Sequence, residues 1–342
     1  MIVVYFLALL VCFVLLARIV DLFFIASLDK ISKDLRLSSD AAGATLMAVG
    51  SSAPELFVAL FAVLKPGEHQ VIGIGSIVGS AIFNLLVIVG VAAWVKQAKL
   101  TWQPIVRDLF FYTASVGLLI YFISDGSITL NETIIFLGVY IVYVVAVIYW
   151  RKILPYSDRI FKEQADKECN KKGVVGTFDR LLCFVFPKQE RYYLVFFFSI
   201  LIIAGLSWVL VELAVIISVS LNIPEAIIAL TVLAVGTSIP DLFSSLIVAK
   251  QGRGEMAVSN AIGSNIFDIL VGLGLPFLIV LLISGGSIGT GGDLNRSSII
   301  LFASVILLFV MLLINKWKIG KFTGFLLIAI YLFYVIWEII IL

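Results

Sequence analysis

The chain has 342 residues, of which 62% are hydrophobic and 13% are charged, and its formal net charge at neutral pH is +2. A mean hydropathy of +1.15 excludes an ordinary soluble domain. The small positive net charge mostly reflects basic residues in loops near anionic lipid and does not indicate a nucleic-acid surface. We therefore expect an all-α polytopic membrane protein that lies in a lipid bilayer and has no nucleic-acid partner.

Apolar runs that are long enough to cross about 30 Å of hydrocarbon recur along the chain. We predict ten transmembrane helices, at about 2–26, 38–64, 71–95, 105–124, 131–150, 192–220, 225–249, 257–283, 297–315 and 321–342. No small-residue cleavage pattern follows the first run, which therefore reads as a helix and not as a removed signal peptide.

Basic residues fall almost entirely on one side of these ten helices. If the N-terminus is outside, every Lys and Arg except Lys65 and Arg296 lies on the inner side. Because cytoplasmic loops carry an excess of Lys and Arg, we predict that both termini are outside and that residues 151–191 are cytoplasmic. His69 then lies in an external loop and faces solvent.

The one long polar stretch divides the chain into two halves of equal helix count. Residues 151–191 hold ten basic side chains and are predicted to be a cytoplasmic linker between a first repeat, 1–150, and a second repeat, 192–342. Each repeat has five predicted helices. Because five is odd, the second repeat enters the membrane from the opposite side, as in the inverted repeats of many secondary transporters.

The two halves also match in sequence. "TLMAVGSSAPELF" at 45–57 aligns with "TVLAVGTSIPDLF" at 231–243, and "GSAIFNLL" at 79–86 aligns with "GSNIFDIL" at 263–270. The matched segments lie in two predicted hairpins, at about 40–95 and 225–283. Helix packing would explain the repeated glycines, but it would not explain repeated acidic residues in apolar helices.

Three carboxylates lie deep in these apolar segments, namely Glu55, Asp241 and Asp268, and Asn84 takes the place of Asp268 in the first repeat. An ionised group at this depth costs at least about 2.5–3.5 kcal/mol and is by default a candidate site. No Lys or Arg lies inside the four helices concerned. We therefore predict that these side chains bind cations.

The surrounding residues supply further oxygen ligands. Pro54 and Pro240 each remove an amide donor and disturb the preceding turn, which predicts that the backbone carbonyls around Ala48 and Ala234 turn toward a cavity. The hydroxyls are those of Ser51, Ser52, Ser80, Thr237, Ser238 and Ser264. Steps of four residues place Ser51, Thr237, Ser80 and Ser264 on the helix faces of Glu55, Asp241, Asn84 and Asp268, respectively. Such an oxygen set suits Ca²⁺ or Na⁺ and argues against Zn or Cu.

Both hairpins resemble the alpha repeats of the cation/calcium exchanger superfamily, whose sodium/calcium exchangers carry G-[TS]-S-x-P-[ED] followed by G-S-x-x-x-[ND]. "GSSAPEL" at 50–56, "GTSIPDL" at 236–242 and an Asp at 268 are most similar to the potassium-dependent branch and its prokaryotic relatives. The resemblance implies an antiporter that exchanges Na⁺ for Ca²⁺ by alternating access in a prokaryotic cell membrane. It implies no enzymatic activity and no cofactor, with inorganic cations as the transported partners.

The same resemblance implies roles for individual residues. Glu55 and Asp241 become the central Ca²⁺ carboxylates, Asn84 and Asp268 become the flanking ligands, and the hydroxyls serve Na⁺. Asn265 matches a further polar position of the potassium-dependent branch. The proton-coupled exchangers of the superfamily carry G-N-x-x-E instead, which does not occur at the corresponding positions.

Several alternatives stay open at this point. Three carboxylates leave one negative charge beside a single Ca²⁺, which either a co-transported K⁺ or a proton on Asp268 would neutralise, and the motif favours K⁺. A Ca²⁺/H⁺ antiporter or an antiporter of another divalent cation is the main alternative, and a passive cation channel is a weaker one. Asp21 and Glu212 either line the ion path or pair with neighbouring groups. Asp108 and Glu338 are expected at the membrane interface. The sequence makes no prediction of oligomeric state.

Overall fold

The computed structural model describes residues 2–34, 48–67, 69–154, 182, 184–187, 189–250, 254–290 and 294–340. Within these residues, eight helical segments are long and apolar enough to cross a membrane. The protein is therefore a multi-pass helical membrane protein, as the composition predicts. Most of the predicted linker at 151–191, including Cys169, lies outside the described residues.

The first half contains the following elements in chain order: α1 (Ile2–Ile19), the π-helical η1 (Val20–Phe24), α2 (Ile25–Asp34), α4 (Ala48–Ser51), α5 (Ala53–Leu64), α6 (Gln70–Phe83), the π-helical η3 (Asn84–Ile88), α7 (Val89–Val95), β1 (Ala98–Lys99), α8 (Trp102–Ile123), β2 (Ser127–Thr129) and α9 (Leu130–Ile153). The helix α9 begins with a capping box, in which Thr129 and Glu132 satisfy backbone amides of the first turn.

The second half repeats this order: η4 (Gln189–Arg191), α11 (Tyr192–Leu221), α12 (Glu225–Ile228), the π-helical η5 (Ala229–Leu233), α13 (Ala234–Thr237), α14 (Ile239–Lys250), α15 (Gly254–Phe267), the π-helical η6 (Asp268–Leu273), α16 (Gly274–Ser284), β3 (Ser287–Gly289), α17 (Asn295–Ile314), β4 (Lys318–Ile319) and α18 (Lys321–Ile340). The residue after α11, Asn222, adopts the left-handed conformation that commonly ends a helix.

The eight long segments correspond to eight of the ten predicted spans. The other two predictions are the spans that carry the prolines. Of 38–64, the structure describes residues 48–64, as α4 and α5. The span 225–249 is interrupted at Ser238, where α13 ends and α14 begins. The spans that are expected to contain broken helices are therefore the ones without a single long helix, and a count of ten stays a prediction.

Two small antiparallel strand pairs show that the two repeats are inverted relative to each other. Strand β1 follows α7 in the first half, and its counterpart β3 follows α16 in the second half. The helix α8, with 22 residues and therefore about 33 Å long, separates β1 from β2. Since β2 pairs with β3 and β1 pairs with β4, the equivalent strands β1 and β3 lie at opposite ends of the bundle.

The strand pairs also define two faces of the molecule, which we name the β1–β4 face and the β2–β3 face. The Glu255 carboxylate accepts a hydrogen bond from the Thr101 amide at 2.9 Å, so the start of α15 lies on the β1–β4 face. Gln70 approaches Gly289, which places the connection between α5 and α6 on the β2–β3 face. Lys96, Lys99 and the lysines beside β4 therefore share one face, opposite Lys65.

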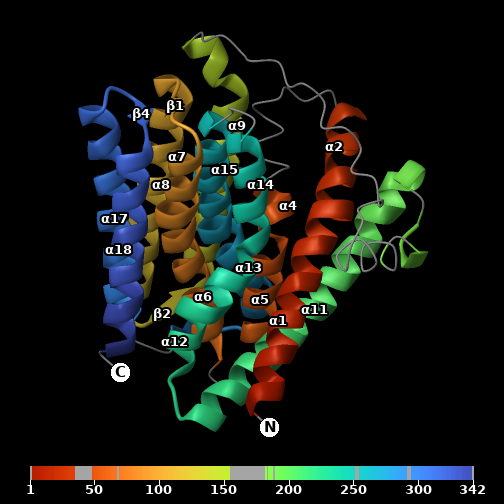
Figure 1. Ribbon diagram of the computed structural model, residues 1–342. Coiled ribbons are helices and arrows are strands. Elements are labelled where there is room, and N and C mark those ends of the chain that lie inside the picture. The colour runs from red at the N-terminus through yellow and green to blue at the C-terminus, as the bar shows by residue number, and fades with distance from the viewer. Residues whose placement is uncertain are drawn as a thin grey trace.

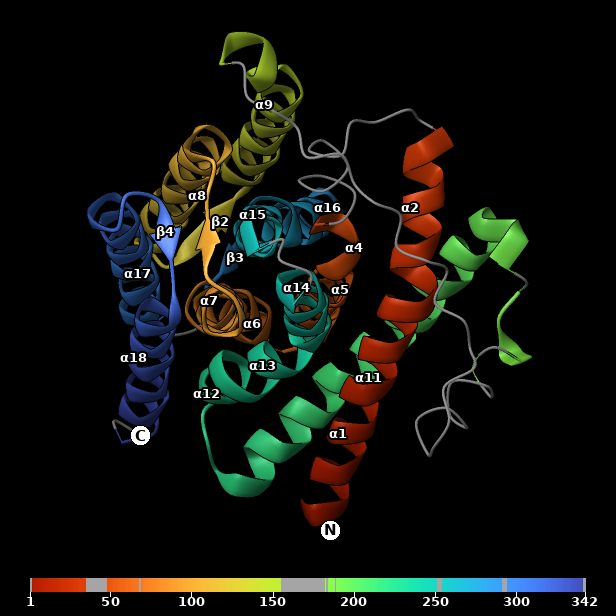
Figure 2. The ribbon, with the colours of Figure 1, turned by 45° about the horizontal axis from the view of Figure 1, so that its top comes forward.

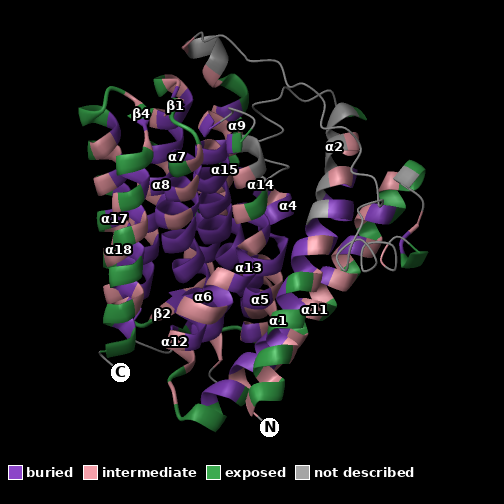
Figure 3. Cartoon of the chain, viewed as in Figure 1, coloured by how far each residue is buried: buried purple, intermediate pink, exposed green. Residues whose placement is uncertain are grey.

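The helices form a compact bundle against which two long helices lie obliquely. In Figures 1 and 2, α1 and α11 run side by side along one flank, and α17 and α18 stand on the opposite flank. The segment Gln70–Val95 is the most enclosed, with 94% of its most apolar window buried. Figure 3 shows the buried residues concentrated in these middle helices, where the two hairpins meet.

Candidate cation-binding site

Both proline-containing helices break at the same residue of the repeat. Ser52, between α4 and α5, has φ −91° and ψ 5°, and Ser238, between α13 and α14, has φ −83° and ψ 3°. These angles lie in the sparsely populated bridge region, which often occurs at functional sites. Since Pro54 and Pro240 follow each break by two residues, the lost amide donor explains why the helix loosens at this position.

Close backbone contact brings the two hairpins together. A Cβ atom added at Gly79 on α6 would lie 2.4 Å from the carbonyl oxygen of Leu230 on η5 and 2.7 Å from the Cβ of Ala234. Only glycine permits this approach. The third and eighth predicted spans then begin a π-helical turn at Asn84 and at Asp268, respectively. Irregular helical turns of this kind often occur at functional sites.

The four groups predicted to bind cations are completely buried: Glu55, Asn84, Asp241 and Asp268 are each 0% exposed. They come together from both hairpins. Ser238 Oγ donates to Glu55 Oε1 at 3.3 Å, and Asn84 Nδ2 donates to Asp241 Oδ2 at 3.4 Å. The carboxylate of Asp268 lies within electrostatic range of both Glu55 and Asp241. The structure therefore gathers the residues that the sequence places on separate helices.

An amide relay fixes how Asn84 is oriented. Asn265 Nδ2 donates to the carbonyl of Ala81 at 3.0 Å and to Tyr112 Oη at 2.9 Å. Because a carbonyl can only accept, Asn265 must turn its own oxygen away from Ala81. That oxygen accepts from Asn84 Nδ2 at 3.0 Å. Asn84 consequently uses both its amide hydrogens on Asn265 and Asp241, and its oxygen stays available.

Five buried oxygen atoms of this cluster form no hydrogen bond of ordinary geometry within the described part of the chain: Ser52 Oγ, Glu55 Oε2, Asn84 Oδ1, Asp268 Oδ1 and Asp268 Oδ2. Of these groups, Ser52 lies near Asp268 and interacts with its carboxylate. Neither Glu55 nor Asp268 forms an ion pair with a described basic residue. Buried oxygens are normally hydrogen-bonded because an orphan costs about 1–3 kcal/mol. A group of orphaned oxygens at one place is the arrangement that a cation would satisfy.

The other predicted oxygen ligands form bonds within the protein. Ser51 Oγ lies 3.2 Å from Ser264 Oγ, across the two hairpins. Ser80 and Thr237 donate to the backbone carbonyls of their own helices, at 3.0 Å in each case. The carbonyl of Ala48 accepts from the Ser52 amide at 3.0 Å, and that of Ala234 accepts from the Ser238 amide at 3.3 Å. Their part in cation binding stays a prediction.

The donor set is one of hard oxygens, spread over two hairpins. Among the described residues, no three His, Cys, Asp or Glu side chains lie close enough together to hold a metal ion between them. Carboxylate, amide and hydroxyl oxygens together are the ligands of Ca²⁺ and of other hard cations. The arrangement suits an ion that both hairpins must share.

Three residues that contact this cluster were not singled out by the sequence. Tyr112, on α8, is fully buried and holds Asn265, and no local pattern marks it. Asn260 interacts with the Asp241 carboxylate. It lies four residues before Ser264, so extending the four-residue step by one more turn would have identified it. Ser207, on α11, donates to the carbonyl of Pro54 at 3.4 Å.

Several acidic residues outside the cluster are paired. Glu212 pairs with Lys65 at 2.5 Å, which favours the pairing role among the two that the sequence leaves open. The side chain of Asp21 lies outside the described residues. The expectation that His69 faces solvent is wrong, because its ring is 20% exposed and lies 2.9 Å from Glu225.

Asp108 and Glu338, which are expected at the membrane interface, are both buried and paired within the protein; their depth in the membrane stays a prediction. Asp108 pairs with Arg107 at 2.8 Å and both side chains are 1% exposed. Tyr143 donates to the same carboxylate oxygen at 3.2 Å. Glu338 is 2% exposed and pairs with Arg296 at 2.6 Å. Helix packing encloses these pairs, which hydropathy along a single sequence does not reveal.

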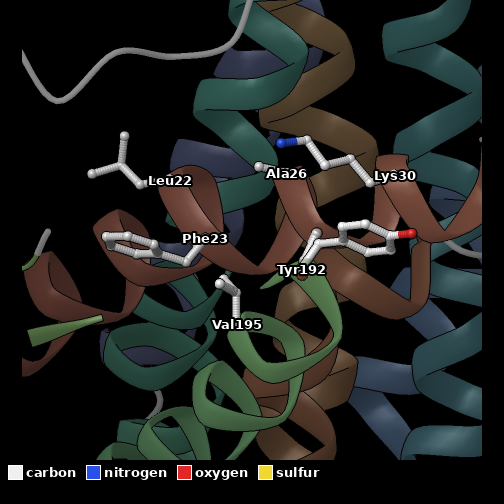
Figure 4. A pocket seen from close by; sticks show the side chains of 7 residues that line it. Leu22, Phe23, Ala26, Lys30, Tyr192 and Val195 are labelled. Atoms are coloured by element: carbon white, nitrogen blue, oxygen red, sulfur yellow. The ribbon is translucent and has the colours of Figure 1, made fainter. Parts of the chain in front are cut away.

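A small pocket on the flank that contains α2 and α11 is distinct from the cluster. It lies between η1 and α2 on one side and α11 on the other (Figure 4). Its lining residues are Leu22, Phe23, Ala26, Ser27, Lys30, Tyr192 and Val195. Most of these side chains are apolar. Tyr192 Oη, at its edge, donates to Asp34 at 2.5 Å. None of the predicted cation ligands lines this pocket.

Comparison with proteins of known structure supports the fold. The sodium-calcium exchanger NCX_Mj aligns over 98% of this chain and 99% of its own, with a TM-score of 0.63 and 23% identity. A crystal structure of the H⁺/Ca²⁺ exchanger CAX aligns over 97% of this chain and 82% of its own, with a TM-score of 0.74 and 15% identity. Both similarities concern the fold alone.

Comparison of sequences extends over nearly the whole chain. Sodium/potassium/calcium exchanger 5 of Homo sapiens is 30% identical, over 97% of this chain and 82% of its own length. Sodium/potassium/calcium exchanger 2 of Gallus gallus is 29% identical, over 95% of this chain and 75% of its own. The family model of the sodium/calcium exchanger protein matches residues 4–149 and 191–340. With both repeats matched in this way, the chain belongs to the sodium/calcium exchanger family.

Proposed function

We propose that the protein is a secondary antiporter that exchanges Na⁺ for Ca²⁺ by alternating access, with Glu55 and Asp241 as the central ligands and Asn84 and Asp268 beside them. The observation that carries this proposal is the group of orphaned buried oxygens contributed by two inverted hairpins. Membership of the sodium/calcium exchanger family supports the same conclusion.

The burial of these ligands explains why the protein would exchange cations and not let them leak through. All four side chains are 0% exposed, so this conformation is closed to both faces. An empty site would carry unpaired carboxylates past apolar helices, at a cost of at least about 2.5–3.5 kcal/mol for each charge. Only an occupied site can therefore reorient readily, and the carboxylates must exchange one cation load for another.

Potassium is the proposed partner of Ca²⁺. Three carboxylates and one Ca²⁺ leave a single negative charge, and a buried uncompensated charge is costly. The relatives in Homo sapiens and Gallus gallus are named sodium/potassium/calcium exchangers. The structural likeness to an H⁺/Ca²⁺ exchanger favours a second candidate, in which a proton supplies the missing charge.

Orientation forms part of the proposal. The β1–β4 face carries Lys96, Lys99, Lys316, Lys318 and Lys321, next to strands whose pairing the structure describes. Because basic residues concentrate on the cytoplasmic side, this face is the cytoplasmic one, in the inner membrane of a prokaryotic cell. Both termini and the β2–β3 face then lie outside.

Uptake of radioactive Ca²⁺ into proteoliposomes tests the proposal. Vesicles loaded with Na⁺ and diluted into Na⁺-free medium that contains K⁺ should accumulate Ca²⁺, and vesicles with Na⁺ on both sides should not. A proton gradient without Na⁺ should drive no uptake. Uptake that follows the Ca²⁺ gradient alone, without countertransport, would identify a channel, and uptake driven only by protons would identify the second candidate.

A further inference from the structure

The hairpin of α14 and α15 continues its polar face beyond the cluster. Ser264 Oγ donates to Asp241 Oδ1 at 3.5 Å, which fixes the level at which these two antiparallel helices meet. Ser245 follows Asp241 by four residues, and Asn260 precedes Ser264 by four residues. One helical turn separates each pair, so Ser245 and Asn260 share the next level, toward the start of α15 on the β1–β4 face.

Both residues bury an oxygen atom that is not hydrogen-bonded. Ser245 is 2% exposed and Asn260 is 7% exposed. Ser245 Oγ and Asn260 Oδ1 have no partner within the described residues. Asn260 interacts with the carboxylate of Asp241, and because a carboxylate only accepts, the amide nitrogen must face Asp241. The amide oxygen of Asn260 is thereby left for another ligand, at the level where Ser245 buries a second orphaned oxygen.

The matching level of the other hairpin is built differently. Ala59 follows Glu55 by four residues and Ser76 precedes Ser80 by four, so they are the counterparts of Ser245 and Asn260. Ser76 Oγ donates to the carbonyl of Gly73 at 3.0 Å. A Cβ atom at Gly73 would lie 3.0 Å from the Cα of Ala59, so α5 and α6 are in direct contact here.

The repeat therefore does not require polar groups at this level. In the first hairpin the space is closed and the hydroxyl of Ser76 is satisfied. In the second hairpin the same level holds two orphaned oxygens, next to the deeper carboxylate of Asp241. Leaving a buried oxygen unpaired costs about 1–3 kcal/mol, so retention of two such groups calls for a ligand that satisfies them.

We propose that Ser245 Oγ and Asn260 Oδ1 form a transient Na⁺ site between the central cluster and the β1–β4 face. The inference rests on the proposed antiport and adds a step to it. Two neutral oxygens and retained water suit a monovalent hard cation, whereas Ca²⁺ takes six to eight oxygens that include carboxylates. An ion that exchanges part of its water for these oxygens passes next to Asp241, one turn deeper. The ion path is then asymmetric, with this step on one face only.

Na⁺ activation of exchange, measured separately from each face of oriented vesicles, tests the inference. Ser245→Ala and Asn260→Leu should each raise the half-saturating Na⁺ concentration at the β1–β4 face by about two- to tenfold, as expected for the loss of one neutral oxygen ligand. The half-saturating Na⁺ concentration at the β2–β3 face should stay unchanged. Ser245→Thr keeps a hydroxyl and should behave as the wild type.

Ser76→Ala is the matched control, because its hydroxyl already bonds to Gly73, and it should change neither face. If Asn260→Leu fails to fold, the pair Ser245→Ala and Ser245→Thr still decides the question. Unchanged Na⁺ activation in Ser245→Ala, in vesicles where the wild type exchanges, would overturn the inference. An equal change in the half-saturating Na⁺ concentration at both faces would overturn it too. Such a result would mean that Ser245 only supports the structure of the central cluster. A wild type without Na⁺-driven exchange would contradict the proposed function instead.

Discussion

Glu55 illustrates how one side chain can be costly to the fold and still be retained. It is fully buried, one of its oxygens accepts from Ser238, and the other has no described partner. A carboxylate held in this way is destabilising unless a charge compensates it. The first helical turn of α5 also contains Glu55, and the positive end of the helix dipole offsets part of that cost.

Neutralising Glu55 should abolish Ca²⁺ transport. In Glu55→Gln the side chain keeps its size but loses the charge that attracts a divalent cation, so Na⁺-driven Ca²⁺ uptake should fall to the background of empty vesicles. Uptake in proteoliposomes and a size-exclusion profile check transport and folding together. Asp125→Asn removes the same charge at an exposed position and should transport normally. Near-normal uptake by Glu55→Gln would show that the central ligand lies elsewhere.

Asp268 is the residue that distinguishes potassium from proton compensation. Its counterpart Asn84 is neutral, so the fold does not need a charge at this position, and neither oxygen of Asp268 forms a hydrogen bond of ordinary geometry within the described residues. If K⁺ supplies the third positive charge, Asp268→Asn should retain Ca²⁺ transport and lose its dependence on K⁺. Uptake with K⁺ replaced by choline measures this. Full activity of the wild type in choline would contradict the potassium requirement.

At the scale of elements, the sequence predicts the helices better than it predicts the contacts between them. Four-residue steps predict which side chains share a face, and the prolines predict the two helix breaks. The contact between Asn84 and Asp241 depends on how closely α6 and η5 approach, which the packing of Gly79 on Leu230 and of Gly75 on Ala229 permits. The anchoring of Asn265 by Tyr112 depends on α8, a helix without any motif. Cross-helix partners of this kind leave no periodic signal in one sequence.

Gly79 should tolerate no side chain. A Cβ atom there would lie 2.4 Å from the Leu230 carbonyl, so Gly79→Ala should force α6 away from η5 and destabilise the protein by about 1–3 kcal/mol. Thermal unfolding in detergent should show a lower midpoint, and Ca²⁺ uptake should fall. Gly117→Ala is the control, because nothing lies within 4 Å of a Cβ at that position. An unchanged midpoint in Gly79→Ala would mean that the hairpins separate without cost.

At the scale of the whole molecule, the two inverted repeats are held together by different side-chain contacts on the β2–β3 face and on the β1–β4 face. On the β2–β3 face, Lys65 pairs with Glu212 and His69 pairs with Glu225, so the turn between α5 and α6 is tied to α11 and α12. On the β1–β4 face, Glu255 bonds to the backbone of Thr101 instead. The sequence predicts the inversion from helix count, but these ties come from loop geometry that no repeat encodes.

The two ends of α8 are predicted to lie on opposite sides of the membrane. Lys96 and Asp125 are both exposed and flank α8 at its two ends, about 33 Å apart along the helix, so one of them must be external if α8 crosses the membrane. A variant without the native cysteines that carries Asp125→Cys should react with a membrane-impermeant thiol reagent in intact cells. The equivalent variant with Lys96→Cys should react only after permeabilisation, because basic loops are retained in the cytoplasm. The reverse pattern would invert the proposed orientation, and reaction of both variants in intact cells would mean that α8 does not span the membrane.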